Sequence, residues 1–96
     1  MGFDINKWIL QHGESFYIVR AIINEADPLG LLKIGWPESE YHLQILLILD
    51  KLDKAKTVEQ IHDLVYGEFF EWFDEGAGNR ENYRLIAGRI NDWKNK

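Results

Sequence analysis

The chain has 96 residues, the size of one small domain, so we expect a single domain spanning residues 1–96. Hydrophobic residues make up 46% of it and aromatic residues 14%, a composition that excludes intrinsic disorder. It contains no cysteine, which excludes disulfides, thiolate metal sites and cysteine nucleophiles. The net charge of −5 at pH 7 disfavours contact with the phosphate backbone, so nucleic-acid binding is not expected.

The first predicted helix is short and covers about residues 4–11, with Ile5, Trp8 and Ile9 on its buried side. This segment has neither the apolar run nor the small-residue cleavage site of a secretory signal. The longest aliphatic run, residues 45–49, is five residues long, whereas a membrane span needs about 20. We therefore expect a soluble, cytoplasmic protein without membrane contact.

Four longer helices are predicted next, because apolar residues recur at the three- and four-residue spacing of a helix. The four stripes are Phe16, Val19, Ile23 and Ala26; Tyr41, Ile45, Ile48 and Leu52; Val58, Ile61, Val65, Phe69 and Trp72; and Tyr83, Ile86, Ile90 and Trp93. The second has further leucines outside its stripe, as is typical of a central helix. The sequence thus predicts an all-α, compact single-domain bundle of four main helices plus a short N-terminal helix.

Local signals indicate where these helices begin and end. Residues 27–30 read Asp-Pro-Leu-Gly, the order of a type I turn, so the helix before them should end near Ala26. Pro37 suits the first turn of the central helix, where its missing N–H costs nothing. Thr57 and Gln60 have the spacing of a capping box at the start of the next helix.

The connection at residues 31–36 is apolar. Such a loop either fills the bundle or presents an adhesive surface. We expect it to fill the bundle, because large apolar patches are uncommon on monomers.

The segments around this loop are Ile22-Ile23-Asn24-Glu25, Asp27-Pro28-Leu29-Gly30-Leu31 and Pro37-Glu38-Ser39-Glu40-Tyr41. In these segments, over roughly residues 16–75, the chain resembles the YugE-like family of small uncharacterised bacterial proteins. The resemblance implies a compact all-helical domain without an assigned activity. Ser39, His42 and Gln44 stand where the family often has acids, which would weaken any cation or basic-partner site there.

The negative charge is concentrated in residues 57–78, which hold six acids and neither Lys nor Arg. The acids in the second half of this stretch are Glu68, Glu71, Asp74 and Glu75, three of them spaced to share one helix face. Acids at a helix C-terminus are opposed by the helix dipole, so something should compensate them. We favour Arg80 and Arg84 of the next helix, which would lie near Asp74 and Glu71; the alternative is a basic partner protein.

Motifs for catalysis or cofactor binding are weak. Glu59 and His62 have the spacing of a carboxylate-bridged di-metal helix, but the chain has only one such copy. No nucleophile elbow or glycine-rich phosphate loop is present in the sequence. We therefore assign no catalytic residue and expect no metal and no cofactor.

Two functions from different classes remain. The leading hypothesis is a non-enzymatic interaction module that binds an unidentified protein through the four acids above or through the 27–41 loop. A basic partner would suit the acids, and one version is an immunity-type protein that neutralises a basic toxin. The alternative is a small-ligand-binding or weakly catalytic pocket around the 27–41 loop. Its candidate residues are Asp27, Trp36, Glu40 and Tyr41.

Overall fold

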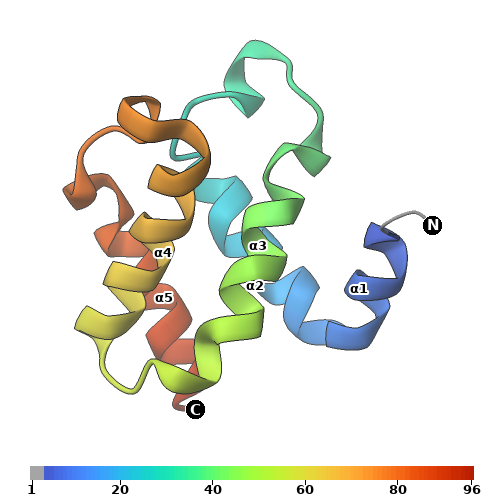
Figure 1. Ribbon diagram of the computed structural model, residues 1–96, viewed down its shortest axis with the longest axis vertical. Helices are drawn as coiled ribbons and strands as arrows, with labels where there is room; N and C mark the ends of the chain where they lie inside the picture. Colours follow the sequence, from blue (N-terminus) through green and yellow to red (C-terminus); the bar gives the residue numbers. More distant parts are fainter. Residues whose placement is uncertain (1–3) are drawn as a thin grey trace.

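The computed structural model describes residues 4–96, and within that range every regular element is a helix (Figure 1). The α-helices are α1 (Ile5–His12), α2 (Glu14–Ala26), α3 (His42–Lys51), α4 (Val58–Phe73) and α5 (Arg84–Lys94). The short 3₁₀ turns are η1 (Leu32–Ile34), η2 (Glu38–Tyr41), η3 (Leu52–Lys54), η4 (Asp74–Ala77) and η5 (Arg80–Tyr83). The predicted architecture, four longer helices after a short N-terminal one, is confirmed for the described chain.

The helices form one compact unit. The Cα radius of gyration is 12.8 Å, close to the value of about 12.5 Å expected for a folded domain of this length. In Figure 1, α4 and α5 run antiparallel to each other on one side of the molecule, and α1 lies on the other side. α3 contacts α1, α2 and α4, as predicted for a central helix, and α2 contacts equally many α-helices, namely α1, α3 and α5.

Aromatic side chains join the helices in the core. The Tyr41 and Phe69 rings lie 5.6 Å apart, and the Phe69 and Tyr83 rings 5.2 Å apart. All three side chains are fully buried. The contacts connect the residue before α3, the C-terminal third of α4 and the residue before α5, close to the regions that hold the candidate sites.

The helix boundaries follow from local hydrogen bonds. α2 ends at Ala26 as predicted, and the Asp27 amide donates to the Ile23 carbonyl at 2.8 Å. The capping box is also confirmed, because the Gln60 amide donates to Thr57 Oγ1 at 3.1 Å while the Gln60 side chain accepts from the Thr57 amide. Pro37 differs from its prediction, since it precedes the 3₁₀ turn η2 and the α-helix begins only at His42.

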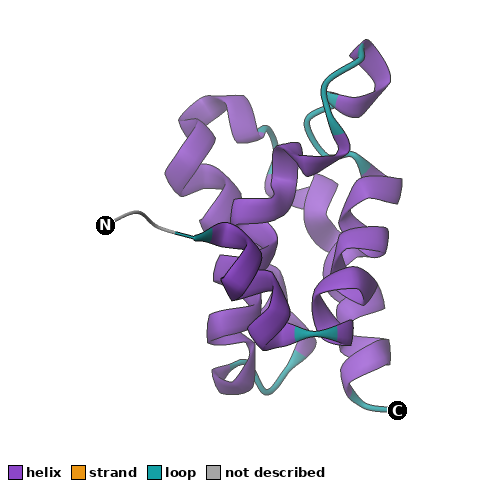
Figure 2. Ribbon diagram, turned by 90° about the vertical axis from the view of Figure 1, so that its right-hand side faces the viewer, coloured by secondary structure: helices purple, strands orange, loops and turns teal. Residues whose placement is uncertain are grey.

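The loop between α2 and α3 is packed in its first half and exposed in its second. Leu29, Leu31 and Leu32 pack partly buried against the core, whereas Ile34 is 71% exposed and Trp36 48% exposed. The part that carries η1 projects from one end of the bundle (Figure 2). The expectation that the whole loop fills the bundle is therefore correct only for its leucines.

Candidate functional site

The acidic candidate residues lie where the chain leaves α4. The helix ends at Phe73, and Asp74 has a φ of 48°, a conformation that starts η4 in a new direction. Two large aromatic side chains of the same stretch are exposed, Phe70 at 43% and Trp72 at 52%. Because they are two residues apart on a helix, they point to different sides of α4. We call the exposed residues of this region the α4-end surface, which consists of Phe70, Glu71, Trp72, Asp74 and Glu75.

Glu68 does not belong to this surface. It is 5% exposed, and its Oε2 accepts from Lys51 Nζ on α3 at 2.5 Å. The hydrogen bond to Glu68, with smaller contributions from the nearby charges of Glu71 and Asp50, raises the pKa of Lys51. The predicted common face of Glu68, Glu71 and Glu75 is wrong for a second reason, because α4 ends before residue 75.

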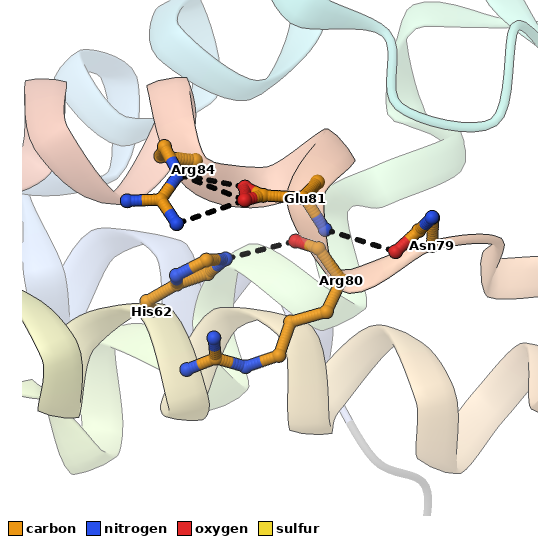
Figure 3. Close-up of polar contacts among 5 residues, drawn as sticks. All are labelled: His62, Asn79, Arg80, Glu81 and Arg84. Atoms are coloured by element: carbon orange, nitrogen blue, oxygen red, sulfur yellow. Dashed lines mark hydrogen bonds and ion pairs between the residues drawn. The ribbon is translucent and has the colours of Figure 1, made fainter.

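The predicted pairing of Arg80 and Arg84 with Asp74 and Glu71 is also wrong. Arg80 pairs with Asp63. Arg84 forms a bidentate ion pair with Glu81, in which its Nε donates to Oε1 at 2.7 Å and its Nη2 donates to Oε2 at 2.8 Å. Figure 3 shows Arg84 directed at Glu81, within its own turn of the chain.

The physical reason is the path between α4 and α5. The 3₁₀ turns η4 and η5 lie between the two helices, within residues 74–83, and they return the chain alongside residues 62–63 of α4. The His62 ring Nε2 donates to the Arg80 carbonyl at 2.8 Å, and Asn79 Oδ1 accepts from the Glu81 amide (Figure 3). These contacts hold Arg80 at the level of residues 62–63, far from the end of α4.

The α4-end surface therefore keeps its negative charge. Within residues 4–96, none of the ion pairs involves Glu71, Asp74 or Glu75. The C-terminal end of the α4 dipole adds to the negative potential at this place. Three acids and two exposed aromatic residues thus lie in one short stretch of the chain, and within residues 4–96 the acids form no ion pair. Lys51 is a nearby cation, since the charge of Glu71 also contributes to its raised pKa.

Asp27 and Tyr41 of the second candidate set are brought together. The Tyr41 hydroxyl donates to Asp27 Oδ1 at 2.6 Å, and the Leu32 and Lys33 amides donate to the two Asp27 oxygens at 3.1 Å each. The Leu29 amide donates to the Tyr41 hydroxyl oxygen at 3.3 Å. The pair is therefore the anchor of the loop, and its hydrogen-bonding groups are engaged within the protein.

The environment of this pair moves both groups away from acid–base work near pH 7. Burial opposes the charge of Asp27, but the hydrogen bonds from Tyr41, Leu32 and Lys33 outweigh it and lower the pKa of this carboxyl. Burial, followed by the hydrogen bond to Asp27, raises the pKa of Tyr41 well above its usual range. A general acid or base works best with a pKa near the working pH, so neither group has the property that catalysis requires.

The remaining members of this set are placed differently. Trp36 is half exposed beyond the anchored part of the loop, and Glu40 is half-buried in η2. Within the described chain, no hydrogen bond joins Glu40 or Trp36 to the Asp27–Tyr41 pair. The structure thus assembles two of the four residues, as a loop anchor.

One feature was missed by the sequence reasoning. A hollow of about 540 Å³, open to solvent, lies at the turn from α3 into α4. It is lined by Lys51, Lys54, Ala55, Gln60, Asp63 and Leu64. The signal that could have located it is the run of lysines at 51, 54 and 56, which stands directly before the acidic stretch.

Comparison of the chain with protein-family models, curated proteins and solved structures finds no match. Among residues 4–96, no helix combines the length and apolar character needed to cross a bilayer. No group of three metal-ligating side chains occurs in that part of the chain. His62 of the Glu59–His62 pair is buried and bonded to a backbone carbonyl.

Proposed function

We propose that this protein is a non-enzymatic interaction module and that its α4-end surface binds a basic segment of another protein. The observation that supports this proposal is the set of three acids that form no ion pair within residues 4–96, in the same stretch of chain as exposed Phe70 and Trp72. Acids attract and orient a cationic partner, and aromatic faces bind Arg and Lys through cation–π contacts. An immunity-type role, in which the partner is a basic toxin in a bacterial cytoplasm, is one form of this proposal.

The arrangement favours a partner over an internal role for two reasons. The dipole of α4 disfavours acids at this end, so the residues do not stabilise the helix they terminate. Exposed aromatic side chains are common where proteins meet, because they bury much area with few rotatable bonds. Together they match an interface with an aromatic anchor and a charged rim.

The test is a binding comparison among three purified forms of the full chain. The first is wild type, the second is Glu71→Gln/Asp74→Asn/Glu75→Gln, and the third is the control Glu14→Gln/Asp53→Asn/Asp92→Asn. Each triple variant loses three negative charges, all of them from exposed positions. Each is immobilised and exposed to bacterial lysate, and the retained proteins are quantified by mass spectrometry.

We expect a basic protein that is retained by wild type and the control variant but not by the α4-end variant. Its retention should weaken at high ionic strength, because exposed charges are screened beyond about 8 Å in 0.15 M salt. A second variant, Trp72→Ala, should also reduce retention. Equal retention by all three forms would contradict the proposal, because another surface would then carry the binding. An equal loss in both triple variants would also contradict it, because net charge would then explain the binding.

A further inference from the structure

The hollow between the end of α3 and the start of α4 is shallow and wide open to solvent, and it is large enough for a small molecule. Its volume of about 540 Å³ lies within the range of roughly 300–1,000 Å³ that is usual for ligand pockets. Leu64 and the small exposed part of Ala55 supply an apolar surface, and most of the lining area is apolar. A ligand that fits must therefore have an apolar body.

The polar groups around this apolar surface are mainly donors. Lys51 and Lys54 contribute ammonium groups. Gln60 uses its Oε1 to accept from the Lys56 and Thr57 amides, so the group it can offer to a ligand is the Nε2 donor. A ligand should consequently present acceptors, and an anionic acceptor would bind most strongly.

The charges in the hollow leave one lysine uncompensated. Asp63 is neutralised by Arg80, and Lys51 is neutralised by Glu68. Lys54, in contrast, takes part in none of the ion pairs found within residues 4–96. Lys94 adds positive charge at the rim, since its Nζ donates to the Ala55 carbonyl at 3.2 Å. The hollow is thus electropositive in a protein of net charge −5.

From this geometry we propose that the hollow binds a small amphipathic carboxylate, with its apolar tail on Ala55 and Leu64 and its carboxylate at Lys54. Lys51 supplies a second donor to the same anion. Its ammonium group has three N–H donors, and the hydrogen bond to Glu68 uses one of them. The site is separate from the α4-end surface and does not depend on the partner proposed above.

The experiment is a titration of the ¹⁵N-labelled full chain with hexanoate, followed by amide chemical shifts. We expect saturable shifts centred on Ala55, Gln60 and Leu64, with a dissociation constant of about 1–10 mM, which is reasonable for a ligand of eight heavy atoms. Butyrate should bind more weakly because it buries less apolar surface. Hexylammonium, which has the same tail and the opposite charge, should leave these amides unshifted.

Two variants locate the carboxylate. Lys54→Met should weaken hexanoate binding by about fivefold or more, the effect of losing one charge-assisted hydrogen bond. The control Lys33→Met removes an exposed lysine from η1 and should leave the affinity unchanged. Amide shifts that change only within a few residues of each substitution would show that both variants remain folded.

Three outcomes would overturn the proposal: no saturable shift at these amides up to 50 mM hexanoate, equal shifts with hexylammonium, or equal affinity in Lys54→Met. None of them bears on the partner proposal, because the α4-end residues do not line the hollow. Conversely, Glu71→Gln/Asp74→Asn/Glu75→Gln should bind hexanoate as wild type does.

Discussion

At the scale of single residues, the two buried carboxylates have different partners and therefore different roles. Asp27 is held by a tyrosine hydroxyl and two backbone amides, all within its own loop. Glu68 depends on one lysine from a neighbouring helix, and its Oε1 is buried without a hydrogen-bond partner. Asp27 is thus satisfied locally, whereas Glu68 is balanced by a single long-range contact.

Removing the Tyr41 hydroxyl tests the loop anchor. Tyr41→Phe keeps the buried ring but deletes a hydrogen bond to a charged carboxyl, so we expect a loss of about 1.5–3 kcal/mol in the free energy of unfolding at pH 7. The pKa of Asp27 is lower in the folded state than its usual value of 3.8. Its stabilising contribution is therefore complete above pH 3.8 and is lost as the pH falls through the folded pKa.

Urea titrations of both forms at several pH values measure this effect. The difference between wild type and Tyr41→Phe should be constant from pH 5 to 7 and should shrink below pH 3.8. A loss smaller than about 0.5 kcal/mol at pH 7, the size of an ordinary surface change, would mean that the pair does not anchor the loop.

Because Lys51 pairs with buried Glu68, we expect removal of the Lys51 charge to lower stability more than removal of the nearby Glu71 charge. Lys51→Met leaves a buried carboxylate without a cation, so it should destabilise the protein by more than about 1 kcal/mol. Glu71→Gln alters an exposed residue outside any internal ion pair of the described chain and should change stability by less than about 0.5 kcal/mol. Denaturant titration at pH 7 compares them; equal effects would show that Glu68 does not depend on Lys51.

At the scale of the elements, the helices could be predicted from the periodicity of apolar residues, whereas the connections between them could not. The core positions Ile45, Ile48 and Val65 follow from helical spacing, and all are fully buried. The path from α4 to α5 could not be predicted, because the 3₁₀ turns η4 and η5 are chosen by long-range contacts such as His62 to the Arg80 carbonyl. Ion-pair partners depend on that path, which is why the expected partners of Arg80 and Arg84 were wrong while the helices were right.

The central position of α3 predicts a large cavity effect. Ile45 has no exposed surface, so Ile45→Ala should cost about 2–5 kcal/mol of unfolding free energy. The matched control is Leu85→Ala on α5, because this leucine is 59% exposed and its truncation should cost less than about 0.5 kcal/mol. Thermal and urea unfolding measure both. Similar losses in the two variants would contradict the placement of α3 at the centre.

At the scale of the whole molecule, the charges divide α4 into two ends of opposite character. The start of the helix borders the lysine-rich hollow, and its C-terminal end carries the uncompensated acids. About ten residues of α4, each with a rise of 1.5 Å, separate the lining of the hollow from the α4-end surface. The two regions are therefore about 15 Å apart along the helix axis. Sequence reasoning located the acidic end because charge is visible in the sequence. It missed the hollow because a concave surface depends on how η3 and α4 meet.

The acids at the end of α4 should be unfavourable for the fold itself. They repel one another and the helix dipole, so Glu71→Gln/Asp74→Asn/Glu75→Gln should raise the free energy of unfolding by about 0.5–1 kcal/mol at low ionic strength. Asn tolerates the positive φ of residue 74 at least as well as Asp, so the backbone adds no cost. The gain should largely disappear in 0.5 M NaCl, where these exposed charges are screened.

The control Glu14→Gln/Asp53→Asn/Asp92→Asn includes Glu14 in the first turn of α2, where an acid is favourable, and should show no such gain. Stabilisation confined to the α4-end variant would mean that these acids are kept at a cost to folding, as expected for residues retained for binding; a loss of stability would instead assign them to holding η4 in place.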